Sequence, residues 1–549
     1  MHLSALDITV VVLYAIFIFV LAQVVSREKP GHKKNSQDYF LASRSLPWWA
    51  IGTSLIAANI SAEQIIGMSG SGYAIGLGIA SYEWMAALTL LIVGKFFLPI
   101  FLRNQIYTMP EFLKRRYGRA TQFVMAILWL VLYVFVNLTS ILWLGATAVH
   151  TVSGLTQEQS LTVLAIFAGA YALYGGLKAI ALTDVVQVSM LVLGGLVIVY
   201  IALERVSGGA GVPGLIDGFH MLMAKAPDHF HMILKPDNPF YKDLPGISVI
   251  VGGLWIANLS YWGFNQYIIQ RGLAAKSVRE AQKGILLAAF LKLLIPLLVV
   301  VPGIAALILA PNLQRPDQAY PTLMTLLPSG LLGLVFAALI AAIIASMGSK
   351  INSIATIFTV DVFKTFRKQS SERVLVIVGR TTAAVALIIA WFTAKPLLGN
   401  FDQGFQYIQD FTGFFTPGIV VIFLLGMFWS RANQAGALVA AVGSVVLSAL
   451  CYFSKWPHVP GLDAFWQGPV MAKIAAVLTQ LGTIPFMNRM GYVFLICLGL
   501  AMVVSLMGKS RPERSTIELK DVDYRTSWFF NLASFAVVVI LVVLYVTFW

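Results

Sequence analysis

The stretch Ser54–Gly76, SLIAANISAEQIIGMSGSGYAIG, decides how the rest of the chain is interpreted. Its overall hydropathy is that of a membrane-spanning helix, yet it contains a glutamate, a glutamine, an asparagine, four serines and four glycines. Irregular polar backbone at membrane depth is tolerated only where it is buried in protein or lines a cavity. The stretch therefore predicts an interrupted helix inside a helical bundle.

The composition supports a membrane protein. The chain has 549 residues, of which 58% are hydrophobic and only 11% charged. A soluble protein of this size cannot bury that much apolar surface, and apolar runs of about 20 residues, long enough to span a bilayer, recur along the chain. The first run, Asp7–Val25, lacks a basic flank before it and is expected to be retained as a span, not cleaved as a signal peptide.

The charge pattern orients the chain. Twenty-six of the 38 lysines and arginines lie in alternate loops, mainly Arg27–Arg44, Arg103–Arg119, Arg271–Lys283, Lys350–Arg373 and Lys509–Arg525. This asymmetry follows the positive-inside rule. It predicts that these loops are cytoplasmic and that both termini are extracytoplasmic. It also accounts for the net charge of +14 through contact with membrane lipid, without nucleic acid as a partner.

The alternation of loops requires about 14 transmembrane helices in a single transmembrane domain over residues 1–549. The expected spans are 7–26, 47–73, 80–101, 121–148, 159–175, 183–203, 248–270, 284–310, 329–349, 374–394, 402–429, 434–453, 489–508 and 528–548. The expected fold class is therefore an all-α polytopic membrane protein. Neither long outer loop, 204–247 or 454–488, is large enough for a catalytic domain.

A second interrupted stretch, WIANLSYWGFNQYIIQR (Trp255–Arg271), follows five spans after the first. Interrupted helices at matching positions of two five-helix halves indicate a LeuT-like transporter built from inverted repeats. The repeats are expected over 47–203 and 248–429, with 7–26 and 434–548 as peripheral helices. Alternatively, the small residues only allow close helix packing, but this leaves Glu63 and Gln64 unexplained.

Three stretches carry a resemblance to a known family. They are DYFLASRSLPWWAIGTSLIAANISAEQIIGMSGSGYAIGLGIASYEWM (38–85), GGLWIANLSYWGFNQYIIQR (252–271) and GGLKAIALTDVVQ (175–187). They resemble the solute:sodium symporter family, in particular its bacterial sodium/galactose (sodium/glucose-type) members. The resemblance implies a sodium-coupled hexose symporter of the bacterial inner membrane that works by alternating access. It implies no cofactor, with sodium as a co-transported ion, and no obligatory protein partner.

The same resemblance implies a sugar site at the membrane midplane. Its residues are Gln64, Glu83, Asn258, Tyr261, Lys292 and Gln409, with Tyr261 as inner gate and Met68, Tyr82 and Phe405 as outer gate. Glu83 and Lys292 lie several residues inside their spans, where an isolated charge costs at least about 2.5–3.5 kcal/mol. Together they leave a near-neutral polar pocket that suits a polyol. The alternatives are a purely structural Glu83–Lys292 ion pair and a purely packing role for Tyr261.

For the cation, the resemblance implies four ligands: the carbonyls of Ala57, Ile60 and Ala342 and the hydroxyl of Ser346. The neighbour of Ser346 is Ala345, where the family's galactose symporters have serine, so one expected oxygen is missing. Asp184 is implied to help sodium leave toward the cytoplasm, although it equally fits a helix cap after Thr183. Because of Ala345, a proton-coupled symporter of a sugar or another small neutral solute stays an alternative.

Two further departures affect the sugar site. Ala86 and Ser260 stand where the galactose symporters have a serine and a tyrosine, and one lost hydroxyl contact is worth about 0.5–1.5 kcal/mol. The identity of the sugar therefore stays open.

An enzyme is not expected, because the sequence contains no H-E-x-x-H, P-loop or G-x-S-x-G motif. A channel would also line a polar path, and only flux measurements distinguish it from a carrier.

Overall fold

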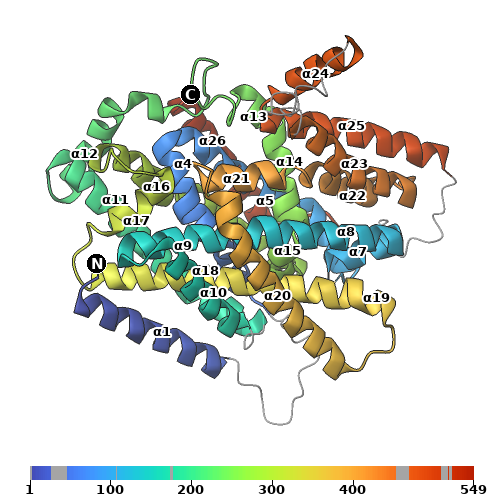
Figure 1. The fold of residues 1–549 in the computed structure, drawn as a ribbon, viewed down its shortest axis with the longest axis horizontal. Coiled ribbons are helices and arrows are strands. Elements are labelled where there is room, and N and C mark those ends of the chain that lie inside the picture. Colours follow the sequence, from blue (N-terminus) through green and yellow to red (C-terminus); the bar gives the residue numbers. More distant parts are fainter. Residues whose placement is uncertain are drawn as a thin grey trace.

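The computed structural model describes residues 3–25, 46–106, 108–172, 177–452, 469–508, 517–518 and 522–549. Within these ranges the regular structure is helical, apart from an isolated parallel bridge between Leu46 and Ala275. Figure 1 shows the helices packed side by side, with α8, α9 and α18 crossing the middle of the view and α1 and α25 at opposite edges. The expectation of an all-helical membrane protein is confirmed.

The helical segments of the first half include five short π- or 3₁₀-type turns, labelled η, that continue or join the α-helices. In chain order they are α1 (Ala5–Val25), α3 (Trp48–Asn59), η2 (Glu63–Met68), α4 (Ser69–Ala74), η3 (Leu77–Ala80), α5 (Ser81–Ile92), η4 (Val93–Phe97), α6 (Leu98–Arg103), α7 (Met109–Arg116), α8 (Arg119–Val131), η5 (Leu132–Leu138), α9 (Thr139–Ser153), α10 (Gln157–Ala172), α11 (Leu177–Ser207), α12 (Gly211–Lys225) and η6 (Pro227–Phe230).

The second half follows the same pattern, and its last four helices are the long apolar α23, α25 and α26 and the shorter α24. Its segments are α13 (Ile247–Val251), α14 (Gly253–Leu259), η7 (Ser260–Phe264), α15 (Gln266–Leu273), α16 (Val278–Leu309), η8 (Pro316–Gln318), α17 (Ala319–Met324), α18 (Leu331–Thr356), η9 (Ile357–Phe363), α19 (Lys364–Phe366), α20 (Glu372–Leu398), α21 (Gly404–Thr412), α22 (Thr416–Phe428), α23 (Gln434–Tyr452), α24 (Pro469–Gly482), α25 (Phe486–Met507) and α26 (Trp528–Thr547).

In the described part of the chain, ten helices are long and apolar enough to cross a membrane. The number is eleven if α21 and α22, which meet at a bend of 47°, form one span. A polytopic membrane protein is therefore confirmed, whereas the count of 14 spans and the division into repeats stay predictions. The long outer segment 204–247 carries α12 and η6, so it is largely helical.

The first expected interruption is present. The Ile60 amide donates to the Ile56 carbonyl (2.7 Å) and ends α3, and the next regular turn begins where the Ile65 amide donates to the Ser61 carbonyl (3.0 Å). Between them Ile60 is extended, with φ −71° and ψ 100°. The last carbonyls of a helix have no donor within it. The carbonyls from Ala57 to Ile60 are therefore at a break, where they can bind a ligand.

The second expected interruption is present as well. It falls at Asn265, which is extended (φ −80°, ψ 123°) between η7 and α15. The Tyr133 hydroxyl of η5 donates to Asn265 Oδ1 (2.8 Å) and accepts from the Gln266 amide (3.3 Å). A side chain from another helix thus satisfies the polar groups exposed by this break, as a membrane interior requires.

Helix α16 lies against both pieces of the first interrupted helix, and glycines allow this close approach. A Cβ at Gly52 of α3 would lie 2.7 Å from the Gly284 carbonyl oxygen, and a Cβ at Gly303 would lie 2.2 Å from the Ser69 carbonyl oxygen. Helix α16 contacts α3 and α4 along its length. Lys292, midway between Gly284 and Gly303, is thereby placed beside the break.

Two cations that the sequence places at the start of cytoplasmic loops are buried in helices, so that assignment was wrong. Arg271 is 1% exposed in α15 and Lys350 is 0% exposed in α18, which continues to Thr356. Each has a buried partner: Arg271 Nε donates to Ser54 Oγ (3.3 Å), and Lys350 Nζ lies 3.4 Å from Glu63 Oε2. Both cations lie next to the end of an apolar run, and hydropathy alone does not reveal the buried partners that keep them inside the protein.

Candidate functional site

A central cavity lies between the two helix breaks. Its volume open to the centres of water molecules is about 80 Å³, several times the roughly 10–15 Å³ that one water needs. All six residues predicted to contact sugar line it: Gln64, Glu83, Asn258, Tyr261, Lys292 and Gln409. The structure therefore brings together side chains from six helical segments: η2, α5, the adjacent α14 and η7, α16 and α21. Their role in sugar binding stays a prediction.

A buried polar network forms one wall of the cavity. Lys292 Nζ pairs with Glu83 Oε2 and donates to Asn59 Oδ1, and it also lies 4.9 Å from the centre of the Trp262 ring. The side chains of Lys292 and Glu83 are 1% and 4% exposed. Asn59 in turn donates from Nδ2 to the Tyr261 hydroxyl (3.1 Å). This network connects α3, α5, α16 and η7 and holds the two opposite charges together.

Other residues that line the cavity present polar atoms without partners. Gln64 Oε1, Thr412 Oγ1 and Thr416 Oγ1 are buried and have no hydrogen-bond partner in the described part of the chain. All three residues line the cavity. Buried polar groups normally have hydrogen-bond partners, so these atoms indicate that water or a polar ligand occupies the cavity. Ala86 and Ser260, the two departures noted in the sequence, also line the cavity.

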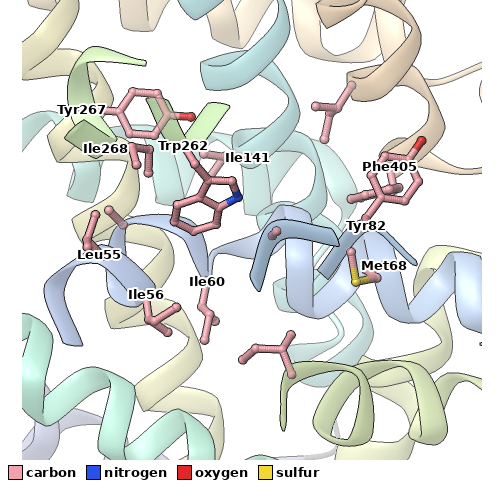
Figure 2. Packing of buried hydrophobic residues seen from close by; sticks show 14 of the residues in the cluster. Leu55, Ile56, Ile60, Met68, Tyr82, Ile141, Trp262, Tyr267, Ile268 and Phe405 are labelled. Atoms are coloured by element: carbon pink, nitrogen blue, oxygen red, sulfur yellow. The ribbon is translucent and has the colours of Figure 1, made fainter. Parts of the chain in front are cut away.

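The predicted outer-gate residues lie together on one side of the cavity. The rings of Tyr82 and Phe405 meet edge to face, with centroids 5.0 Å apart. Figure 2 shows Met68 beside this pair, away from Trp262 and Tyr267. All three gate side chains are buried. In this structure the residues predicted to close the outer side are therefore in contact.

The helix that carries Phe405 and Gln409 is anchored by residues that the sequence did not single out. Asp317, 0% exposed in η8, accepts a hydrogen bond at Oδ2 from the Gly404 amide (2.9 Å), the first of α21. Ser71 of α4 donates to Gln403 Oε1 (2.7 Å). Burial raises the pKa of the Asp317 carboxyl to about 7, although the Gly404 amide and Arg315 lower it. Nothing in the loop pattern around Asp317 marks this anchor.

A second buried ion pair lies on the other side of the network. Lys350 Nζ is 3.4 Å from Glu63 Oε2 and 4.9 Å from the centre of the Tyr267 ring. The pair joins η2 of the first interrupted helix to α18. It explains Glu63, which the sequence left without a role. The sequence feature that could have predicted this pair is Lys350 itself, which lies one helical turn after Ser346 on the same face of α18.

Tyr261 and Arg271 make contacts between helices on the side of the site predicted to be the inner one. Tyr261, the predicted inner gate, packs against the rings of Trp262 and Tyr267 with centroids 5.2 and 6.1 Å away. Arg271 donates to the hydroxyls of Ser54 on α3 (3.3 Å) and Ser349 on α18 (3.4 Å). Arg271 thus links α15 to both helices that carry the predicted cation ligands. This role of Arg271 was not predicted, because the residue was expected at the start of a loop.

The predicted cation ligands lie on two helices in contact. Ala57 and Ile60 are at the end of α3, Ala342 and Ser346 are on α18, and these helices pack against each other. Ser346 is 3% exposed, and its Oγ has no hydrogen-bond partner in the described residues. An unsatisfied buried hydroxyl opposite free carbonyls fits a hard cation that prefers oxygen ligands. Asp184 lies on α11 in a part whose side chains the structure does not describe.

Comparison with known proteins agrees with this architecture. A family model described as sodium:solute symporter family matches residues 39–443. The chain is 47% identical to a sodium/glucose cotransporter of Vibrio parahaemolyticus over 100% of this chain and 99% of that protein. It is 35% identical to a mouse sodium/myo-inositol cotransporter over 82% of this chain and 67% of that protein.

A solved structure shares the fold. The substrate-bound, outward-open state of a sodium-coupled sialic acid symporter superposes with a TM-score of 0.74. The match covers 92% of this chain and 99% of that chain at 20% sequence identity. The family model covers more than half of the chain, and the Vibrio relative covers all of it. The chain therefore belongs to the sodium:solute symporter family, and it is a transporter, not an enzyme.

Proposed function

We propose that this protein is a sodium-coupled symporter of a galactose- or glucose-type hexose that works by alternating access. The observation that carries the proposal is the central cavity, where the buried Lys292–Glu83 pair faces unpartnered polar atoms such as Gln64 Oε1. The pair adds no net charge to the cavity. A polyol, with donors and acceptors on several sides, can satisfy these groups without introducing a charge.

The names of the relatives agree with this substrate class. Glucose and myo-inositol, named for the Vibrio and mouse proteins, are both neutral and polyhydroxylated. A carboxylate or amino acid would instead need an unopposed cation, and the cation in this cavity is already paired with Glu83. Tyr261 adds an aromatic face for the C–H groups of a sugar ring. Ala86 and Ser260 each remove a side-chain contact and thus influence which hexose is preferred.

Sodium is the proposed coupling ion, bound by the carbonyls of Ala57, Ile60 and Ala342 and by Ser346 Oγ. Ala345 leaves one coordination position for water. One charge that enters across about 100 mV releases about 2.3 kcal/mol, and a tenfold sodium gradient adds about 1.4 kcal/mol. One ion can therefore drive several-hundred-fold accumulation. Asp184 is proposed to receive the ion on its way to the cytoplasm.

The proposed topology has 14 spans, with inverted repeats over 47–203 and 248–429 and both termini outside. The proposed location is a bacterial inner membrane, with lipid as the surrounding partner and no obligatory protein partner. In the proposed cycle, sodium ties α3 to α18 and steadies the outward-open state. Sugar then lets Tyr82 and Phe405 meet, and movement of Tyr261, with release of the Arg271 contacts, opens the inner side.

Proton coupling is the alternative, and the observation that favours it is Ala345, which removes one expected sodium ligand. Calorimetric titration of the purified protein with galactose or glucose, in sodium or in choline, tests the main proposal. Sodium should tighten sugar binding, and sugar should tighten sodium binding by the same factor, because coupling between binding sites is reciprocal. Binding that is equal in both salts would contradict sodium coupling.

A further inference from the structure

A basic pocket lies at the ends of two membrane spans, away from the central cavity. It encloses about 310 Å³ and is lined by the cations Lys114, Arg119, Lys364 and Lys368, with Gln122 and Val360 between them. Lys114 belongs to α7, Arg119 begins α8, Lys364 begins α19, and Lys368 follows α19. Helices α8 and η9 are in contact, and α7, α8 and α19 lie at the same end of the molecule (Figure 1).

The pocket carries an excess of positive charge. None of the four cations forms an ion pair within the described ranges, and all four are exposed. Two acids lie nearby: Glu111 pairs with Arg115, and the buried Asp361 accepts a hydrogen bond from Gln122 Nε2 (2.5 Å) and offsets part of the charge of Lys114. Four like charges around one small volume repel one another, and an anion in the pocket relieves this repulsion.

Apolar side chains beside the cations indicate which kind of anion fits. Val360, on the pocket wall, is 46% exposed, and Phe366, which packs edge to face on Phe123 (5.8 Å between centroids), is 72% exposed. Arg119 begins one helical segment that is long and apolar enough to cross a membrane, and Phe366 ends another, so the pocket lies where two such segments end. A free phosphate ion would leave these apolar surfaces uncovered. An amphiphile covers both the cations and the apolar residues.

We propose that this pocket binds an anionic phospholipid of the cytoplasmic leaflet. Its phosphate lies among Lys114, Arg119, Lys364 and Lys368, and its acyl chains follow Val360 and Phe366. Basic pockets between transmembrane helices on the cytoplasmic side recognise such headgroups. The lipid contacts α7 and α8 from the first proposed repeat and α19 from the second, so it holds the two repeats together at this end. The inference goes beyond sugar transport and is testable without it.

Native mass spectrometry of the purified full-length protein in detergent tests the proposal, with phosphatidylglycerol and phosphatidylcholine of identical acyl chains as probes. The wild type should retain phosphatidylglycerol at one to one and retain phosphatidylcholine far more weakly. Removing two of the four cations in Lys364→Gln/Lys368→Gln should weaken phosphatidylglycerol binding roughly 30-fold. The matched control Lys276→Gln/Arg279→Gln removes the same charge from another basic loop and should leave binding unchanged.

A second variant, Lys114→Gln/Arg119→Gln, alters the opposite wall and should weaken binding as much, which separates the pocket from a folding defect in either variant. Equal binding by both pocket variants and the control would overturn the proposal. Equal retention of both lipids would also overturn it. If millimolar inorganic phosphate or glycerol 3-phosphate displaced phosphatidylglycerol completely, the pocket would be a site for soluble phosphates, and the lipid assignment would be wrong.

Discussion

Substitutions at Lys292 and Glu83 test whether this buried pair binds substrate or only holds helices together. Both side chains are almost fully buried, at 1% and 4% exposure, and they pair with each other at the cavity wall. Removing one partner of such a pair leaves an uncompensated buried charge, which costs about 3–5 kcal/mol. Lys292→Met should therefore destabilise the protein strongly and abolish uptake. Glu83→Gln should destabilise it through the unpaired ammonium of Lys292.

The double variant Lys292→Met/Glu83→Gln separates the two roles. It restores electrical balance, and replacing a whole buried pair by groups of similar volume is often neutral or stabilising. The apparent melting temperature should thus return close to the wild-type value. Sugar uptake in proteoliposomes should stay lost, because the ammonium and the carboxylate proposed to bind sugar hydroxyls are gone. Recovery of both stability and uptake would refute the reasoning, since the pair would then only hold helices together.

Further substitutions test the cation site and the outer anchor. Ser346→Ala removes the proposed contact between a hydroxyl and the sodium ion, which is worth about 1.5–3 kcal/mol. The half-saturating sodium concentration of uptake should therefore rise roughly 10- to 150-fold. An unchanged sodium dependence would place the site elsewhere. Ala345→Ser adds an oxygen and should lower that concentration about two- to tenfold, and an increase would contradict the assignment. The Asp317 carboxyl has a raised folded pKa of about 7, so its contribution to stability falls as pH rises from about 4 to about 7. The melting temperature of Asp317→Asn minus that of the wild type should accordingly be more positive at pH 8 than at pH 5. An equal difference at both pH values would show that the carboxyl is not buried as described.

Features that depend on local sequence were predictable. The polar residues of Ser54–Gly76 and Trp255–Arg271 conflict with a continuous apolar helix, and both stretches are broken near Ile60 and at Asn265. Hydropathy located the apolar helices because an apolar segment in a membrane must form a helix, in which its backbone groups hydrogen-bond to one another. The six proposed sugar residues meet in one cavity, although only the family resemblance, and no periodicity, selected them.

Features that depend on long-range pairing were not predictable. Glu63 and Lys350 are separated by 287 positions, and neither alone reveals that the other neutralises it. Arg271 and Lys350 were interpreted as loop residues because each lies at the end of an apolar run and its buried partner is distant in the sequence. The Asp317–Gly404 anchor joins two segments 87 positions apart through a backbone amide, which carries no sequence signal. These contacts appear only once the helices are packed.

The measurement that tests the central claim most directly is uptake of labelled galactose into proteoliposomes. An inward sodium gradient is compared with choline at equal pH, and then with an imposed proton gradient. The account predicts accumulation of galactose that requires the sodium gradient and disappears in choline. Accumulation that ignores sodium and follows the proton gradient would contradict it, and would make Ala345 the substitution that changed the coupling ion.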